Sequence, residues 1–130
     1  MEISRRTAYI SGHIDLTPPE FEKHYIPKID EAISKGDHFI VCDAAGADKM
    51  AQEYLRMRGQ MNDFTKVRVF HMFDRPRHTV EGFITIGGFT SDINRDTTAT
   101  LNSDYDIAWV RPGRESSGTA KNIERRNIKK

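Results

Sequence analysis

The clearest structural signal in this chain is HFIVCDAAGAD, residues 38–48. Its first half, His38–Cys42, is a nearly continuous apolar run, which is typical of a strand buried on both faces in a parallel sheet. The second half is small and acidic, and an amphipathic helix pattern follows it from about Ala47 to Arg58. A buried strand that leads through a short turn into a helix predicts an α/β fold.

The same alternation of strands and helices extends along the chain in both directions. The segment TPPE at 17–20 predicts a helix start, because it supplies an N-cap threonine, a proline in the first turn and the glutamate of a capping box. Apolar residues then recur every four positions, Pro27 predicts a kink, and Gly36 ends the helix. The other predicted elements are strands at Thr7–Ser11, Val67–Met72 and Asp106–Val110, helices at Ser91–Leu101 and Thr119–Arg126, and a long loop from Phe73 to about Gly88.

This order of elements predicts a single Rossmann-like domain over residues 1–130. We expect three layers, with helices on both faces of a mainly parallel sheet of four or five strands. Ligands of such sheets bind beyond the carboxyl ends of the strands. The loops after Ile10, Cys42, Met72 and Val110 are therefore the ones to search for a site.

Composition excludes several classes of function. Twenty Lys and Arg residues against nineteen Asp and Glu leave a formal charge of +1, so no global basic field favours nucleic acid. No apolar run approaches the roughly 20 residues of a membrane span, and the first residues lack the apolar core of a signal peptide. One cysteine excludes an internal disulfide, and the scattered histidines have no metal-ligand spacing. We expect a cytoplasmic protein without a membrane partner, metal or cofactor.

The loops after the first, second and last predicted strands carry residues suited to a ligand. Small residues at a helix start leave backbone N–H groups open to an anion, arginines add positive charge, and carboxylates suit sugar hydroxyls. The simpler alternatives are tight turns, N-caps and solvated polar loops. The candidate ligand-binding residues in these loops are Ser11, Gly12, His13, Asp43, Gly46, Ala47, Asp48, Arg111, Ser117, Gly118 and Thr119.

More polar residues come shortly before the last predicted strand. Asn94, Arg95 and Asp96 are further ligand-binding candidates. We expect charges of both signs to face one another across one cleft, with Arg95, Arg111 and Arg114 opposite Asp43, Asp48, Asp96 and Asp104. Asp104 stands at the entrance of the strand, as a candidate catalytic carboxylate or as a turn former. The charged residues 74–77 of the long loop form either a lid or ordinary surface charge.

Four segments of the chain, taken in order, resemble the SLOG superfamily of Rossmann-like proteins. They are Tyr9–His13, Asp43–Ala51, the pair Asn94 and Asp104, and Ser103–Trp109 followed by Ser117–Ala120. This superfamily includes the Lonely Guy phosphoribohydrolases and the DNA-processing protein A family, and the chain most resembles its small YpsA-related branch. The resemblance covers roughly residues 7 to 126.

The resemblance implies a nucleotide or nucleotide-derived ligand, with Gly12, Gly46, Ala47 and Asp48 lining it and residues 118–119 at its phosphate. It leaves catalysis open. Lonely Guy enzymes, and the similar nucleoside deoxyribosyltransferases, use a glutamate three residues beyond the threonine of Gly-Thr. That position is Asn122 here, and an amide is neither a nucleophile nor a general base.

Three functions therefore stay open from the sequence. The first is a sensor or binding module for a nucleotide-derived small molecule. The second is a hydrolase or transferase acting on the N-glycosidic bond of a nucleotide, with Asp104, Asp48 or Asp96 as its carboxylate. The third, least favoured, is a DNA-associated module by analogy with DNA-processing protein A, since only the basic tail from Lys121 to Lys130 supports it. A homo-oligomer is also left open.

Overall fold

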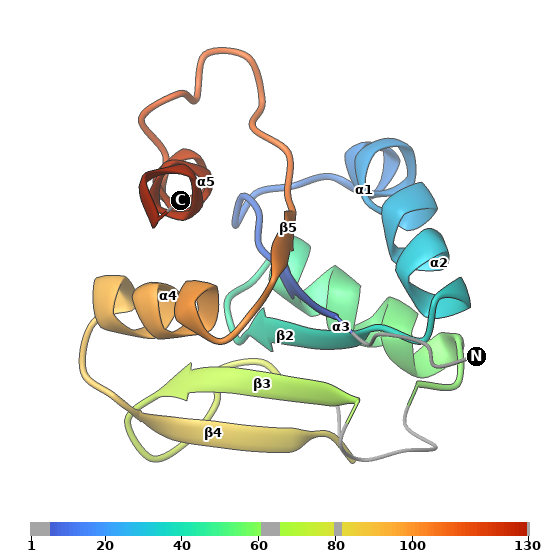
Figure 1. Ribbon diagram of the computed structural model, residues 1–130, viewed down its shortest axis with the longest axis horizontal. Coiled ribbons are helices and arrows are strands. Elements are labelled where there is room, and N and C mark those ends of the chain that lie inside the picture. The colour runs from blue at the N-terminus through green and yellow to red at the C-terminus, as the bar shows by residue number, and fades with distance from the viewer. Residues whose placement is uncertain (1–5, 61–65, 80–81, 130) are drawn as a thin grey trace.

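A computed structural model describes residues 6–60, 66–79 and 82–129, with the backbone alone at 128–129. Within these residues the sheet has five strands, all parallel, in the order β4-β3-β2-β1-β5 (Figure 1). The strands are β1 (Thr7–Ile10), β2 (His38–Cys42), β3 (Val67–Met72), β4 (Ile84–Phe89) and β5 (Tyr105–Ile107).

Helices cover both faces of this sheet. One face carries α1 (Pro18–His24), α2 (Ile26–Ser34) and α3 (Ala47–Met57), and the other carries α4 (Asp92–Leu101) and α5 (Gly118–Lys129) (Figure 1). The predicted three-layer α/β architecture is confirmed. No helix among the described residues is both long enough and apolar enough to cross a membrane.

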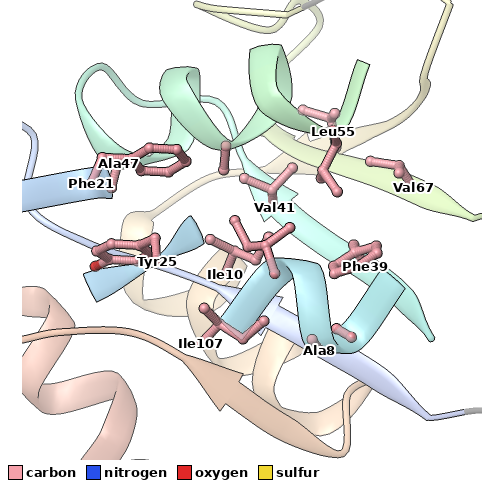
Figure 2. Packing of buried hydrophobic residues seen from close by; sticks show 14 of the residues in the cluster. Ala8, Ile10, Phe21, Tyr25, Phe39, Val41, Ala47, Leu55, Val67 and Ile107 are labelled. Carbon is pink, nitrogen blue, oxygen red and sulfur yellow. The ribbon is translucent and has the colours of Figure 1, made fainter. Parts of the chain in front are cut away.

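The alternation of side chains along the strands builds two cores. Ala8, Ile10 and Val41 point toward α1, α2 and α3, where they meet apolar side chains of those helices (Figure 2). Tyr9, Ile40 and other intervening residues point the opposite way, toward α4. Full burial of one such aliphatic side chain contributes about 1.5–3 kcal/mol, so the central strands hold the layers together.

The predicted first helix is two helices. The predicted capping box is present, because the Thr17 side chain accepts from the Glu20 N–H and Glu20 accepts from the Thr17 N–H. The break falls at Tyr25 rather than at Pro27. Pro27 lies in the first turn of α2, where a missing N–H costs no helical hydrogen bond.

Two strand predictions are corrected. The predicted loop from Phe73 to about Gly88 contains most of β4, an edge strand whose glycines and half-exposed residues hide the usual apolar signal. The last strand, predicted at Asp106–Val110, is Tyr105–Ile107. It ends early because β1, its neighbour in the described sheet, ends where Ile10 pairs with Ile107, and the Trp109 N–H instead donates to the Tyr25 hydroxyl at 3.1 Å.

Candidate functional site

A pocket of about 380 Å³ lies at the carboxyl edge of the sheet. The chain passes from β1 outward to β4 and then returns to place β5 on the other side of β1. The segment after β1 therefore leads to α1 on one face, and the segment after β5 leads to α5 on the other (Figure 1). Ligands of open α/β sheets bind at such reversals of strand order. We call this hollow the carboxyl-edge pocket.

The structure brings most of the predicted site residues to this pocket. Two segments far apart in sequence, the turn after β1 and the start of α5, both line it, together with the first turn of α3 and part of α4. The predicted residues that line it are Ser11, Gly12, His13, Asp48, Arg95, Asp96, Ser117, Gly118 and Thr119.

The start of α5 is arranged to receive an anion. The Ser117 hydroxyl accepts from the Ala120 N–H at 3.2 Å and so caps the helix. A Cβ added at Gly118 would meet no atom within 4 Å, so this glycine faces open space. Backbone N–H groups and the helix dipole favour negative charge at this position.

Asp48 places a buried carboxyl group in the first turn of α3. The group is 6% exposed, and one of its oxygens, Oδ2, accepts from the Ala44 N–H at 3.1 Å. Burial raises the pKa of Asp48 to about 7, against the opposing effects of that hydrogen bond and of Arg95. At neutral pH this carboxyl is therefore protonated in a large fraction of molecules and able to donate.

Asp96 is held by donors on one of its two oxygens. Its Oδ1 accepts from the Tyr9 hydroxyl, from Arg95 Nε and from Arg95 Nη2, each at 3.1 Å. The Asn122 amide in turn donates to the Tyr9 hydroxyl oxygen at 3.4 Å. Among the described residues, Oδ2 of Asp96 has no hydrogen-bond partner, so that oxygen is open to a ligand hydroxyl.

Asp43 supports the pocket without lining it. This carboxylate is fully buried and accepts from Arg77 and Arg95, with Arg77 donating from Nε at 3.3 Å and from Nη2 at 3.1 Å. Burial alone would raise the pKa of Asp43, but the hydrogen bonds and charge of Arg77 outweigh it and lower the pKa. Asp43 thus fixes two arginines at the pocket wall.

His13 joins the loop after β1 to the loop before α5. Its Nε2 accepts from the Arg111 N–H at 2.9 Å, which requires an unprotonated Nε2. Burial, with the nearby charges of Arg114 and Arg111, lowers the pKa of His13 and keeps the ring neutral at neutral pH.

Arg111 was predicted to hold phosphate, but the structure engages its side chain elsewhere. The guanidinium donates to both carboxylate oxygens of Glu20, at 2.9 and 2.7 Å, and to Asp15 at 3.2 Å. These bonds tie the loop before α5 to the start of α1. Arg114, the next arginine along, lines the pocket and lies 3.4 Å from an Asp15 carboxylate oxygen.

Gly46 and Ala47 serve the turn before α3 rather than the pocket lining. Gly46 has a φ of +73°, and a Cβ there would lie 2.4 Å from the carbonyl oxygens of His13 and Ile14. The Ala47 N–H donates to the same His13 carbonyl at 3.1 Å. Close packing between the turn before α3 and the loop after β1 therefore accounts for the small residues at these positions.

Asn94 and Asp104 lie outside the pocket lining. Asn94 is exposed in the first turn of α4, with its N–H donating to the capping Ser91 hydroxyl. Asp104 accepts from the Thr7 N–H at 2.7 Å, at the amino end of β1. It therefore stands at the opposite edge of the sheet from Asp48 and Asp96, contrary to the single cleft expected from the sequence.

Several pocket residues were not among the predicted ones. Alternation along β1 puts Tyr9 on the same side as Ser11, and helical spacing puts Asn122 one turn after Gly118, so these two had a usable signal. The other residues reach the pocket because loops bring distant segments together, and the local sequence pattern gives no sign of that arrangement. The unpredicted lining residues are Tyr9, Ile14, Cys42, Ala44, Asp92 and Asn122. Two arginines also line the pocket: Arg114, which was expected at the cleft, and Arg77, which was expected in a lid or on the surface.

The described part of the chain holds no group of three or more His, Cys, Asp or Glu side chains placed to bind a metal ion. The site is thus built from helix-start N–H groups, three arginines and three aspartates around one pocket.

Comparison of the chain with protein-family models, with curated proteins and with solved structures finds no match.

Proposed function

We propose that this protein binds a nucleotide or nucleotide-derived small molecule in the carboxyl-edge pocket, as a sensor or binding module. One observation carries the proposal: the open start of α5 and the carboxyl groups of Asp48 and Asp96 line the same pocket of about 380 Å³. Helix-start N–H groups suit a phosphate, and carboxyl groups suit sugar hydroxyls. The volume is within the range of small-molecule sites, and the resemblance to the SLOG superfamily points to the same ligand class.

The hydrogen-bonding state of the pocket supports a polar ligand. The Ser11 hydroxyl is buried, lines the pocket and has no hydrogen-bond partner among the described residues. Burying an unpaired hydroxyl costs free energy, so a ligand that bonds to Ser11 would recover part of that cost. Arg77 and Arg95 are paired with the buried Asp43, and Arg114 is paired with the exposed Asp15, so the N–H groups at the α5 start are the main phosphate donors.

Calorimetric titration tests this proposal against nucleoside monophosphates and diphosphates, ADP-ribose and NAD. We expect micromolar or tighter binding of at least one compound. Gly118→Val places a side chain at the α5 start, where an added Cβ meets no atom within 4 Å, and should weaken binding at least about tenfold. Ser116→Val is the matched control, because Ser116 is an exposed residue of the same loop outside the pocket lining, and it should bind as the unchanged protein does. A folded protein that binds none of these compounds would contradict the proposal.

A second candidate function is hydrolysis or transfer at the N-glycosidic bond of a nucleotide. The observation that favours it is Asp48, a buried pocket carboxyl with a pKa of about 7. In hydrolysis the bond between C1′ and the base nitrogen breaks, water oxygen bonds to C1′, and the departing base takes a proton. Asp48 would give that proton, and the open oxygen of Asp96 would receive the proton that water loses.

Chromatography for free base after prolonged incubation with nucleotides tests this second candidate. Asp48→Asn and Asp96→Asn should each lower release of the base at least about a hundredfold. Asp104→Asn is the control, because Asp104 bonds to Thr7 at the opposite edge of the sheet and should retain turnover. Turnover that survives in both pocket variants would contradict the assignment.

A further inference from the structure

A second hollow, of about 450 Å³, borders the carboxyl-edge pocket. It lies between one side of α3 and the segment Arg77–Thr79, and Arg77 lines both hollows. The α3 side is formed by Lys49, Gln52, Glu53 and Arg56. We call it the α3 groove. The two hollows therefore meet at Arg77.

The α3 groove carries more positive than negative charge. Lys49 and Arg56 contribute two cationic side chains beside Arg77, which is paired with Asp43, and Glu53 is the only carboxylate among the described lining residues. Lys49 and Arg56 are exposed, and neither has an ion pair within the described part of the chain. In the carboxyl-edge pocket, Arg77 and Arg95 are paired with Asp43, and Arg114 is paired with Asp15. Lys49 and Arg56 are therefore the cations beside the pocket that remain for a second anion.

The boundary between the two hollows is rigidly held. The Arg77 N–H donates to Asp43 Oδ2 at 2.7 Å, and the His78 N–H donates to the Asp43 carbonyl at 3.1 Å. From the α3 side, the buried Gln52 amide donates to the carbonyls of Cys42 and His78, at 3.1 and 3.0 Å. Arg77 nevertheless keeps about half of its side chain exposed (51%). A ligand crossing the boundary therefore meets a fixed, half-exposed guanidinium.

We infer that the α3 groove is a subsite for a second phosphate-bearing part of the ligand, so that the ligand is a nucleoside bisphosphate or a dinucleotide rather than a mononucleotide. This inference rests on the proposed nucleotide binding in the carboxyl-edge pocket. The first phosphate lies at the start of α5, the sugar lies by Asp48 and Asp96, and the second phosphate lies beyond Arg77. Lys49 and Arg56 then neutralise that second phosphate.

The test compares ligands that differ by one phosphate-bearing part. Titrations use the 5′-monophosphates of adenosine, guanosine, cytidine and uridine, their 3′,5′-bisphosphates, and the 5′-phosphorylated dinucleotides pApA, pGpG, pCpC and pUpU. The variant Lys49→Glu/Arg56→Glu reverses the charge of the groove. Lys23→Glu/Lys28→Glu is its matched control, because these exposed lysines occupy equivalent positions, near the end of α1 and in the first turn of α2, outside both hollows.

The expected result has two parts. A bisphosphate or a dinucleotide binds the unchanged protein at least about tenfold more tightly than its monophosphate, and this advantage disappears in Lys49→Glu/Arg56→Glu but remains in the control. Equal binding of the compared ligands, or an advantage that survives the groove variant, overturns the subsite while leaving nucleotide binding intact. Failure of every compound of both panels, ADP-ribose and NAD included, to bind the folded protein overturns the proposed function and the subsite together.

Discussion

At the scale of single residues, Asp48 has the most consequential environment in the site. The carboxyl group is buried in the first turn of α3, where only the Ala44 N–H bonds to it among the described residues. An ionised carboxylate with one donor is poorly compensated for the loss of water. The pocket therefore holds one aspartate that gains a proton easily, Asp48, beside one fixed by three donors, Asp96.

Asp48 should make the stability of the protein fall as pH rises. In an unfolded chain an aspartate titrates near pH 3.9, whereas Asp48 in the folded protein titrates at about 7. Between these values the folded chain holds the extra proton, so raising the pH favours unfolding by up to about 1.4 kcal/mol per pH unit. Asp48→Asn removes this proton and keeps an oxygen to accept from Ala44.

Urea unfolding of both proteins at about pH 4.5 and about pH 7 measures the effect. The unfolding free energy of the unchanged protein should drop by about 3 kcal/mol relative to that of Asp48→Asn between these two conditions. A difference between the two proteins that does not change with pH would contradict the buried, protonated state of Asp48.

At the scale of elements, Tyr25 is the point where three segments meet. It stands at the break between α1 and α2, and its hydroxyl donates to the Ser11 carbonyl at 2.8 Å and accepts from the Trp109 N–H at 3.1 Å. These bonds link α1 to the ends of β1 and β5, the two strands that flank the pocket. The ring stacks on Phe21 at 5.5 Å, so the residue also belongs to the main core (Figure 2).

Tyr25→Phe should lower the unfolding free energy by about 2 kcal/mol, because it leaves a carbonyl and an N–H without their partner in a buried place. Tyr54→Phe is the matched control. Tyr54 also packs on Phe21, but its hydroxyl bonds to Asp30 and Arg58 near the surface. The control should cost less than about 1 kcal/mol in the same urea titration. Equal losses would show that the Tyr25 hydroxyl does not secure this junction.

Elements with a strong local signal were predictable from the sequence, and those defined by their neighbours were not. β2 was predictable because every residue from Phe39 to Cys42 is apolar, and all of them are buried. The start of α1 was predictable because its capping box is complete within four residues. β4 forms because β3 offers it a partner, and its own glycine-containing, half-exposed sequence carries no matching pattern. The extent of β5 is likewise set by β1.

For the whole molecule, the fold class predicted which edge of the sheet to search, but not the pairing of charges there. Ser11, Asp48 and Gly118 reach one pocket because parallel strands end at one edge. Arg111 and Asp104 were expected to contact a ligand at the same edge. The Arg111 side chain instead bonds to Glu20 of α1, and Asp104 lies at the amino end of β1. Ion-pair partners depend on distant segments such as Glu20, and spacing along the chain gives no sign of them.

The sheet order also predicts a gradient of local stability. β1, β2 and β3 each have a neighbouring strand on both sides, whereas β4 and β5 are the two outermost strands of the sheet. We expect backbone amides of Ile40 and Val41 to exchange with deuterium at least about a hundredfold more slowly than amides of β4, because edge strands open without unfolding the core. Amide exchange followed by NMR checks this. Equally slow exchange in β4 would contradict the expectation and would indicate that another chain covers this edge.

The walls of the carboxyl-edge pocket belong to different layers of the molecule. Asp48 starts a helix on one face of the sheet, and Thr119 lies in a helix on the other. A ligand touching both walls acts as a non-covalent cross-link between helices on opposite faces of the sheet. By mass action such a ligand adds about 2.7 kcal/mol to the unfolding free energy at a hundred times its Kd. The melting temperature of the protein thus becomes a readout of ligand concentration.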